Sequence, residues 1–410
     1  MDSRWSLSRC INGAGMTKKK ACNDKFMNKK VAVIISPNYK DYARKYLAEC
    51  VASIRKQDYA GEMKIFITDN ESTEASYEYV KKILDGEDSE GKIPLAPFVK
   101  GGKYEILRNK NNDGFAKGNN DCLKLALKQG YDYLVLFNMD TVVAADCVRK
   151  MVEAVENNLD SRLRGNDKDK SGNDKREIGA VQARLMLYNK KEIINSLGNV
   201  THIFGFGYAY GYGEKYNKEF SIKDICYPSG AAVLFKREAL EKVGLFDEEF
   251  WMYNEDQDLG WRLWLNGWRC VLAPPAVAYH KYQFVRSIKQ YYWMDRNRIM
   301  AILKNYHLFT LILISPAFIV MEAGLLFFAA RQGWFKEKMN VYKYFFNRKN
   351  WRYILTVRKQ AQGLRQIGDR QIIKMFSGKI WYQEIDSKQL KISNVIFNAC
   401  WQIVKVLIRW

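Results

Sequence analysis

The chain has 410 residues and a mass of 47.9 kDa, which is more than one average domain of about 150 residues. Hydrophobic residues make up 48% and charged residues 27%, so bulk disorder is excluded. The net charge of +21 is uneven, because residues 281–410 contain 23 basic and only 6 acidic residues. The excess positive charge is therefore a property of the last third of the chain.

The eight cysteines are widely spaced and form no CxxC pair, which excludes the usual zinc and thioredoxin motifs. Several lie in apolar runs, so we expect free, buried, reduced thiols and a location on the cytosolic side of a membrane. Residues 1–30 contain no apolar run of signal-peptide length. They are interpreted as a polar, poorly ordered lead-in.

From residue 31 onward, short apolar runs alternate with segments of helical periodicity. Strands are predicted at 31–35, 63–67, 104–107 and 133–137, and helices at 41–57, 72–84 (with Ser72 as the cap) and 115–129. This order predicts an α/β fold with a mainly parallel sheet flanked by helices. In such sheets, ligands bind beyond the carboxyl ends of the strands.

Residues 160–177 interrupt this pattern with almost no apolar content and a repeated Gly-Asn-Asp-Lys. We interpret them as a flexible surface insert without a catalytic role. Strands resume near 179–187, and the glycine- and aromatic-rich residues 203–213 predict a loop or twisted hairpin.

Polar residues and glycines follow each of the first four strands. They are Ser36, Asn38, Asp69, Asn70, Asn112, Gly114, Phe115, Asn138 and Asp140. Asp69 can accept hydrogen bonds from a nucleobase or ribose, and Asp140 can hold a divalent cation, which prefers carboxylate oxygen. A helix cap explains any single aspartate here equally well, but it explains several aligned strand ends less well.

A second polar cluster begins a short helix with an apolar stripe after residue 258. Asp258 and Arg262 are four residues apart and are expected to pair structurally. Glu255 and Asp256 have no such partner in the sequence. A carboxylate on a rigid helix start, with Trp251 nearby to limit water, can act as a general base that contributes about 10²–10⁴ in rate.

Two further sequence features bear on this cluster. The small residues around Ser229 and Gly230 form a turn that gives a substrate access to the base. His280 ends a strand-like run, where a lone histidine is usually structural. The alternative is that its imidazole supplies a second protein ligand to a cation held by Asp140.

Six of these motifs, in this order along residues 31–305, resemble family 2 glycosyltransferases of the GT-A fold. They are Val31–Asn38, Asp69–Thr73, Asn112–Asn120, Asn138–Thr141, Ser229–Ala231 and Gly244–Asp247 with Tyr253–Arg262 and His280. The rhamnosyltransferase-like and galactofuranosyltransferase-like branch is the most similar group.

The resemblance implies a GT-A catalytic domain over 31–305. It also implies inverting transfer of a sugar, with rhamnose among the candidates, from a nucleotide-diphosphate donor to a glycan or polyprenyl-linked hydroxyl in cell-envelope polysaccharide synthesis. Asp69 matches the residue that reads the nucleotide, and Asp256 matches the general base.

For the metal, the resemblance implies a divalent cation, Mg or Mn, on Asp140 and His280. Asn138 replaces the first aspartate of the family's Asp-x-Asp, which loosens the expected metal requirement. The other strand-end residues are expected on the donor side. Ser229, Gly230, Trp251 and Glu255 are expected on the acceptor side.

Residues 306–410 are predicted to form a basic, apolar, helical membrane-associating region. The apolar run 308–330 would reach about 35 Å as a helix, enough to cross a hydrocarbon core of about 30 Å. Pro316 and Glu322 argue against a clean span, so two shorter helices at the membrane interface are an equal alternative. Arg296 and Arg298 are interpreted as part of a basic helix near the membrane, with contact to a diphosphate as the alternative.

Two other arrangements and two other functions stay open. The C-terminal region is alternatively a helical subdomain packed on the catalytic core or on another subunit, and a homo-oligomer is not excluded. The pI of about 9.4 raises the hypothesis of a nucleic-acid-binding protein. It is disfavoured because the basic residues are interleaved with apolar ones. A basic or membrane-binding scaffold without catalysis is the remaining alternative to an enzyme at the cytoplasmic face of the bacterial inner membrane.

Overall fold

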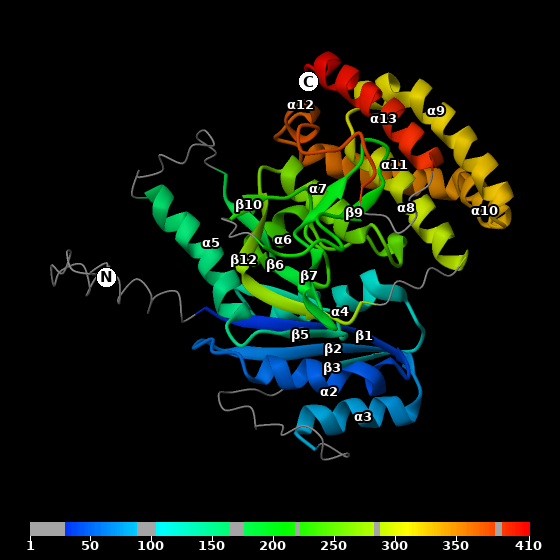
Figure 1. Cartoon of the computed structure of the whole chain (residues 1–410). Helices are drawn as coiled ribbons and strands as arrows, with labels where there is room; N and C mark the ends of the chain where they lie inside the picture. The colour runs from blue at the N-terminus through cyan, green and yellow to red at the C-terminus, as the bar shows by residue number, and fades with distance from the viewer. Residues whose placement is uncertain (1–28, 88–103, 164–175, 218–221, 283–287, 382–387) are drawn as a thin grey trace, which may run out of the picture.

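A computed structural model describes residues 29–87, 104–163, 176–217, 222–282, 288–381 and 388–410 (Figure 1). The predicted lead-in over 1–30 therefore lies almost wholly outside the described residues. The predicted insert over 160–177 lies mostly outside them too. Its first residues continue helix α5, Cys147–Leu163, and strand β6 begins at Ile178.

The described strands form one large mixed sheet and a small hairpin. The large sheet has the order β10-β12-β6-β11-β4-β1-β2-β3, with β5 paired to β12 and β7 to β6. Bounds of the strands are β1 Val31–Lys40, β2 Met63–Ser72, β3 Glu105–Asn109, β4 Tyr133–Phe137, β5 Thr141–Val143, β6 Ile178–Leu187, β7 Lys190–Ser196, β10 Lys223–Asp224, β11 Ala232–Lys236 and β12 Arg269–His280. The hairpin pairs β8, Asn199–Thr201, with β9, Gly207–Ala209. It overlaps in part with residues 203–213, where a loop or twisted hairpin was predicted.

The direction of the strands places the polar strand ends at one edge of the sheet. β4, β1, β2 and β3 run parallel, and β12 runs parallel to β6. β11 is antiparallel to both β4 and β6, so those two share a direction. The predicted α/β class with a mainly parallel sheet is thus confirmed, and the carboxyl ends of six strands lie on the same side.

Helices cover both faces of the sheet. They are α2 Tyr42–Arg55, α3 Glu74–Asp85, α4 Gly114–Lys128, α5, α6 Arg237–Val243 and α7 Glu255–Leu265, with a 3₁₀ turn η1 at Glu248–Phe250. Within β1, Ala32 and Ile34 face one core, whereas Val31, Val33 and Ile35 face the other. This alternation is the two-residue period of a strand that is buried on both sides.

One predicted cap is wrong. Helix α3 begins at Glu74, and its cap is Thr73, whose hydroxyl accepts a hydrogen bond from the Ser76 amide at 3.2 Å. Ser72 instead ends β2, because the strand continues five residues past its predicted end at Ile67.

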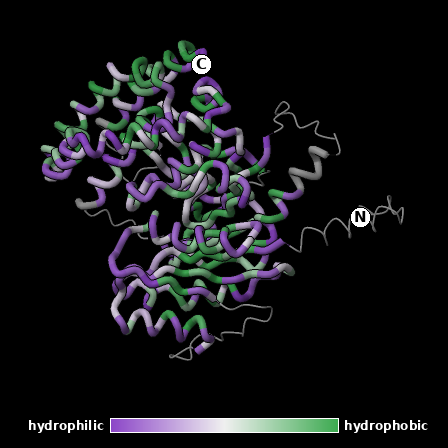
Figure 2. Tube along the Cα trace, turned by 180° about the vertical axis from the view of Figure 1, so that it is seen from behind, coloured by the Kyte–Doolittle hydropathy of each residue, from purple (hydrophilic) through white to green (hydrophobic). Residues whose placement is uncertain are grey.

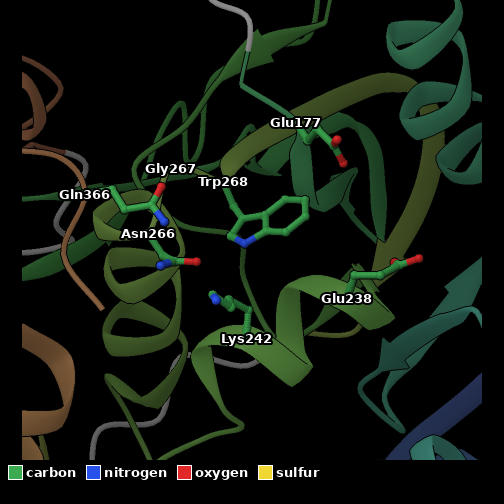
Figure 3. A pocket seen from close by; sticks show the side chains of 7 residues that line it. All are labelled: Glu177, Glu238, Lys242, Asn266, Gly267, Trp268 and Gln366. Atoms are coloured by element: carbon green, nitrogen blue, oxygen red, sulfur yellow. The ribbon is translucent and has the colours of Figure 1, made fainter. Parts of the chain in front are cut away.

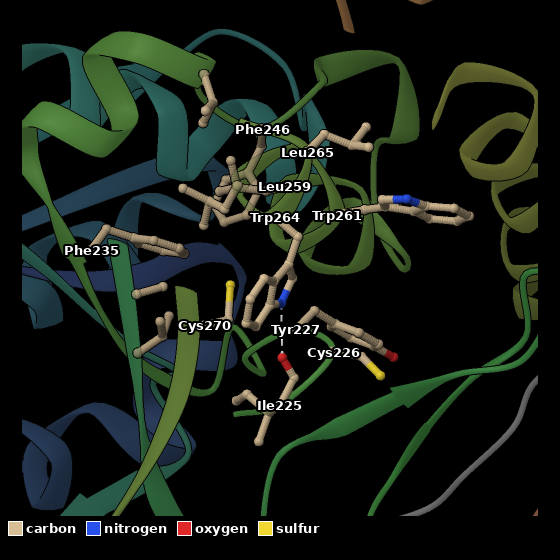
Figure 4. Packing of buried hydrophobic residues seen from close by; sticks show 14 of the residues in the cluster. Ile225, Cys226, Tyr227, Phe235, Phe246, Leu259, Trp261, Trp264, Leu265 and Cys270 are labelled. Carbon is tan, nitrogen blue, oxygen red and sulfur yellow. Dashed lines mark hydrogen bonds between the residues drawn. The ribbon is translucent and has the colours of Figure 1, made fainter. Parts of the chain in front are cut away.

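Helix α7 is anchored in the core on the β11 and β12 side of the sheet (Figure 4). Trp264 is buried and donates its indole N–H to the Ile225 carbonyl at 3.0 Å. Leu259 and Leu265 pack in the same cluster. The predicted ion pair between Asp258 and Arg262 is present at 2.8 Å and is buried. The first turn of α7 is therefore held rigidly by the rest of the helix.

The C-terminal region is helical and packs on α7. Its helices are α8 Ile288–Asn305, α9 Leu308–Arg331, α10 Phe335–Phe346, α11 Arg348–Gly363, α12 Asp369–Ile372 and α13 Lys388–Leu407. Trp261 of α7 makes edge-to-face contacts with Tyr306 and Phe376. Helix α9 is continuous through Pro316, so the expectation of two shorter helices there is wrong.

Four buried charges join three of these helices. Glu322 of α9 pairs with Arg298 of α8 and, at 2.6 Å, with Lys338 of α10. Asp295 pairs with Arg298 at 2.6 Å and with Lys338 at 2.7 Å. Arg296 is buried as well. Both guanidinium groups are therefore interior groups that do not add to an exposed basic surface, and the nearness of their helix to a membrane stays a prediction.

Candidate functional site

Asn38 and Asp69 meet at the carboxyl ends of β1 and β2. The Asn38 Nδ2 donates to Oδ1 of Asp69 at 2.9 Å and to the Ser76 hydroxyl at 3.1 Å. The other oxygen, Asp69 Oδ2, is buried without a hydrogen-bond partner among the described residues, and Arg108 Nε lies 3.5 Å from it. A buried acceptor left unpaired is costly. This oxygen is thus available to a donor group on a ligand.

Asn70 and Asn112 shape the turn that begins α4. Asn70 Nδ2 donates to the Gly114 carbonyl at 2.9 Å, and Asn112 Oδ1 accepts from the Gly114 amide at 3.2 Å. Gly114 has a φ of +84°, and a Cβ there would lie 2.5 Å from Trp251. Only glycine fits this turn. These predicted donor residues therefore form a wall that touches Trp251.

The turn after β4 carries Asn138 and Asp140. The Ser36 hydroxyl accepts a hydrogen bond from the Met139 amide at 2.9 Å, so Ser36 supports this turn from β1. Asn138 Oδ1 is buried and has no partner within the described part of the chain. The turn thus presents a second unpaired acceptor at the same edge of the sheet as Asp69.

Asp140 and His280 face each other across the sheet edge. His280 Nε2 lies 3.2 Å from Asp140 Oδ1, and its Nδ1 lies 2.9 Å from Asn195 Oδ1. An amide oxygen only accepts, so Nδ1 carries the proton and Nε2 points at the carboxylate. Burial opposes the charge on Asp140. The contacts to His280 and to the Tyr42 hydroxyl outweigh burial and hold the pKa of Asp140 below its usual range.

This donor set fits a divalent cation. A carboxylate oxygen and an imidazole nitrogen converge at hydrogen-bond distance, and the orphaned Asn138 oxygen belongs to the same turn as Asp140. Among the described residues, no three His, Cys, Asp or Glu side chains cluster as a complete metal site. The protein would therefore supply part of the coordination only.

Asp256 lies in the first turn of α7 and approaches the sheet edge from a different element than Asp140. Its Oδ2 accepts from the Gly230 amide at 3.3 Å, and its Oδ1 accepts from the Gln257 amide at 2.8 Å. Removal from water raises the pKa of Asp256 to about 6. A carboxylate with such a pKa is well matched to proton transfer near neutral pH.

Glu255 lies beside Asp256 and is more deeply buried. Its Oε2 has no hydrogen-bond partner among the residues described. Burial, and then the neighbouring Asp256 charge, raise the pKa of Glu255 well above its usual range. Burial and the neighbouring charge thus disfavour ionisation of Glu255 more strongly than burial disfavours ionisation of Asp256.

A backbone in the left-handed region leads into α7. Trp251, Tyr253 and Asn254 have φ values of +60°, +67° and +64°, which non-glycine residues rarely adopt. Asn297 of α8 holds this loop, because its Nδ2 donates to the carbonyls of Phe250, Met252 and Tyr253 at 2.7–2.8 Å. The position of the first turn of α7 therefore depends on a residue of the C-terminal helices.

The two halves of the site are joined through the turn at Gly230. Asp256 bonds to the Gly230 amide, and the next carbonyl, that of Ala231, accepts from the Asn138 amide at 3.0 Å. Phe115 of the donor side lies against Gly230, about 3.3 Å from where a Cβ would stand. Asp140 and Asp256 thus lie at one edge of the sheet.

The remaining acceptor-side residues also line this junction. The Ser229 hydroxyl accepts from the Ala231 amide at 3.3 Å, and its own amide donates to the Gln182 side chain at 2.7 Å. The Trp251 ring stacks on Trp293 of α8, with ring centroids 4.8 Å apart. Every predicted site residue is thus found at this edge or in the turns that support it.

Four residues at this edge were not predicted from the sequence, namely Tyr42, Arg108, Asn195 and Asn297. Their partners are far away in sequence: Asn195 is 85 residues from His280, and Asn297 is 44 to 47 residues from the carbonyls it holds. Arg108 lies one residue before the end of β3, so its place near a strand end was the available signal.

A shallow hollow of about 440 Å³ lies elsewhere, among Glu177, Trp268, Glu238, Lys242, Asn266, Gly267 and Gln366 (Figure 3). Glu177 precedes β6 and Trp268 precedes β12, which places the hollow at the amino ends of these strands. It is therefore at the opposite end of the sheet from Asp140 and His280.

Comparison with known proteins gives partial matches along the chain. A segment of 62 residues is 45% identical to the N-acetylglucosaminyl-diphospho-decaprenol L-rhamnosyltransferase of Mycobacterium tuberculosis (strain CDC 1551 / Oshkosh), covering 15% of this chain and 20% of that protein. A segment of 217 residues is 25% identical to the poly-beta-1,6-N-acetyl-D-glucosamine synthase of Staphylococcus epidermidis, covering 52% of this chain and 46% of that protein. The chain thus spans less than half the length of these relatives.

Solved structures resemble the chain distantly. GalNAc-T7 with UDP, GalNAc and Mn²⁺ gives a TM-score of 0.46 at 13% identity, over 68% of this chain and 48% of that one. S. aureus TarS 1-349 with UDP gives 0.41 at 15% identity, over 92% of this chain and 90% of that one.

The family profile described as Glycosyl transferase family 2 matches residues 33–244, which is more than half of the chain. The matched residues include the β1, β2 and β4 ends and the turn at Gly230, but stop short of Asp256 and His280. With that match, and with Asp69, Asn138 and Asp140 gathered at the carboxyl ends of its strands, the chain belongs to glycosyl transferase family 2.

Proposed function

We propose that this protein is an inverting glycosyltransferase that uses a nucleotide-diphosphate sugar. One observation carries the proposal: Asp140 with His280, and Asp256 from another element, lie at one sheet edge where Asp69 Oδ2, Asn138 Oδ1 and Glu255 Oε2 are buried oxygens without a hydrogen-bond partner among the described residues. A site that gathers unpaired acceptors is suited to a ligand rich in hydroxyl and N–H groups.

The donor is proposed to bind across the ends of β1, β2 and β4. The free Asp69 oxygen would accept from the nucleobase or ribose, in a place that Asn38 fixes. Asn70, Asn112 and Gly114 would form the wall beside it, with Phe115 reaching toward Gly230. Asn138 would meet the donor near its diphosphate.

Asp140 and His280 would hold a divalent cation. When bound, such an ion offsets the negative charge that grows on the leaving diphosphate. The mixed oxygen and nitrogen donor set favours Mn²⁺ over Mg²⁺, since Mg²⁺ prefers oxygen ligands alone. Asn195 would keep the Nε2 of His280 aimed at the ion, because its amide oxygen fixes the proton on Nδ1.

Asp256 is proposed as the general base. Its carboxylate would take the proton from an acceptor hydroxyl while that oxygen bonds to the anomeric carbon of the donor and the bond to the diphosphate breaks. A single displacement of this kind inverts the anomeric centre. The acceptor is proposed to reach Asp256 from the side of Ser229, Gly230, Trp251 and Glu255.

The acceptor is proposed to be a glycan or polyprenyl-linked sugar of the cell envelope. The relatives named above support this class, because one is named for a decaprenol-linked acceptor and the other for a polymer of N-acetylglucosamine. Rhamnose is the sugar that the first of them suggests for the donor. The protein is proposed to act at the cytoplasmic face of the bacterial inner membrane. Residues 31–305 would form the catalytic domain and residues 306–410 the membrane-associating region.

A panel of nucleotide sugars with and without Mn²⁺ tests the proposal. We expect the true donor to raise the melting temperature only when Mn²⁺ is present. Asp256→Asn should still show this shift, but its transfer rate should fall by about 10²–10⁴. The matched control is Asp146→Asn, a partly exposed aspartate paired with Lys150 of α5, which should transfer at the wild-type rate.

Two results would contradict the proposal. One is transfer by Asp256→Asn at the wild-type rate. The other is a folded wild-type protein whose melting temperature no nucleotide sugar in the panel changes, which would favour the scaffold without catalysis.

A further inference from the structure

Helix α9 exposes large apolar side chains along its outer side. Its buried residues include Thr310 and Glu322, while Ile319 and Val320 are 66% and 71% exposed. Other large apolar side chains on its outer side are exposed too, namely Leu308, Phe309, Ile312 and Phe327. Water does not favour this arrangement, because it leaves a large contiguous apolar surface exposed.

Helix α13 adds a second exposed apolar stripe. Ile392, Val395, Ile396, Ile403, Val406 and Leu407 are exposed along it at helical spacing. Its inner side packs on the core through Val404. The ends of α9 and α13 are joined, because the Trp410 indole donates to the Thr310 hydroxyl at 2.8 Å and Phe309 contacts the Trp410 ring. Figures 1 and 2 show the two helices together on the outside of the C-terminal region, with many apolar residues.

The charges around these helices point to an anionic partner. Beyond residue 287, the acids that the structure describes are Asp295, Glu322, Glu337 and Asp369, and all but Glu337 are buried in ion pairs. Basic residues in the same region are exposed, namely Arg331, Lys336, Lys343, Arg348, Lys349, Arg352, Lys359, Arg370, Lys374, Lys391 and Arg409. The outward charge is therefore almost wholly positive, next to an apolar surface.

Helix α9 is also the one described helix that is long and apolar enough to cross a membrane. Its inner face, however, is fixed at two places. Glu322 pairs with Arg298 and Lys338, and Thr310 bonds to Asp369 at 2.6 Å. A transmembrane position would remove Glu322 from these partners and leave the buried Arg298 and Lys338 with Asp295 as their one shared counter-charge among the described residues, which is unfavourable.

We propose that α9 and α13 lie in the plane of an anionic lipid bilayer, with only their outer apolar faces inserted and the flanking Lys and Arg side chains on the headgroups. This geometry matches an interfacial amphipathic surface, in which apolar burial and charge attraction act together. It extends the membrane location proposed above by stating how the chain is held there.

Vesicle flotation of the full chain, without donor or acceptor, tests the surface. We expect the protein to float with vesicles of phosphatidylcholine and phosphatidylglycerol, and much less with phosphatidylcholine alone. Ile319→Asp with Val320→Asp on α9, and Val395→Asp with Val406→Asp on α13, should each weaken binding at least about tenfold. The matched control is Ile222→Asp, an exposed isoleucine before β10, which should bind like the wild type.

A second measurement separates an in-plane from a spanning helix. An epitope tag at the C-terminus should be cleaved by protease added outside intact vesicles. Protection of the tag would overturn the in-plane arrangement. The surface itself would be overturned if the wild type did not float, or if the α9 and α13 variants floated like the wild type. It would also be overturned if these variants split a dimer, by light scattering, while flotation was unchanged. Because no sugar is present, vesicle binding can fail while sugar transfer stands.

Discussion

The sheet edge and the C-terminal helices both bury charged side chains, but they satisfy them differently. In the helices, Asp295, Glu322, Arg298 and Lys338 form a closed set of ion pairs. At the sheet edge, oxygen atoms of Asp69, Asn138 and Glu255 are buried without a hydrogen-bond partner among the described residues.

The difference distinguishes buried charges that stabilise the fold from buried atoms that are expected to bind a ligand. A buried charge that is fully paired needs nothing from outside, and its role is to fix how elements pack. A buried acceptor that is left unpaired costs stability unless a ligand completes it. The unpaired atoms therefore mark the place where this chain is expected to bind its substrate, whereas the paired ones mark the joint between α8, α9 and α10.

The largest effect is expected from opening the closed set. Glu322→Ala leaves Arg298 and Lys338 buried with Asp295 alone, so we expect the free energy of unfolding to fall by about 3–5 kcal/mol. Chemical denaturation measures this change in the free energy of unfolding. Glu337→Ala on α10 is the control, because this half-buried glutamate makes no ion pair with the described residues, and it should stay within about 0.5 kcal/mol. A loss below about 1 kcal/mol for Glu322→Ala would show that the ion pairs do not hold the helices.

The next effect concerns Asn297, a residue that links both regions. Asn297→Ala removes three hydrogen bonds to the left-handed loop before α7, so we expect roughly 2–4 kcal/mol of lost stability and a 10–100-fold lower kcat/KM. Asn350→Ala removes one bond to the Tyr344 carbonyl, outside the loop, and should leave kcat/KM unchanged. An Asn297→Ala enzyme that is destabilised but has normal kcat/KM would reduce Asn297 to a purely structural residue.

Much of the sheet edge was predictable from sequence for a physical reason. Short apolar runs locate buried strands, and parallel strands share one carboxyl edge, so Asp69, Asn138, Asp140 and His280 had to meet. The first turn of α7 was predictable too, because the apolar stripe fixes which residues begin the helix and places Asp256 there.

The rest depended on contacts that no local pattern encodes. Asn195 and Asn297 act on partners that are distant in sequence, and the left-handed φ values of Tyr253 and Asn254 occur where no glycine signals them. Helix α9 is apolar all round, so its sequence cannot say which side is buried. Its inward face is set by Glu322 finding Arg298 and Lys338 on other helices.

A smaller effect is expected at the metal pair. Asn195→Leu removes the acceptor that fixes the Nδ1 proton of His280, so we expect Mn²⁺ affinity to fall about 10–100-fold. Asn195→Asp keeps an acceptor at this place and should retain most of the affinity. Titration of Mn²⁺ by calorimetry or electron paramagnetic resonance measures both variants. Equal Mn²⁺ affinity in the Asn195→Leu variant and the wild type would show that Asn195 does not contribute to metal binding.

The smallest change is a displaced pH profile rather than a loss of activity. The base must be ionised to accept a proton, and burial raises the pKa of Asp256 to about 6, so kcat/KM should fall about tenfold per pH unit below that value. An ordinary aspartate, with a pKa near 3.9, would keep the rate flat down to about pH 4. Because burial is the main cause of the shift, Glu255→Gln should leave the acid limb in place, whereas Trp251→Ala, by admitting water, should move it to lower pH. If the pH profile of Trp251→Ala still fell off near pH 6, the Trp251 indole would not be what excludes water from Asp256.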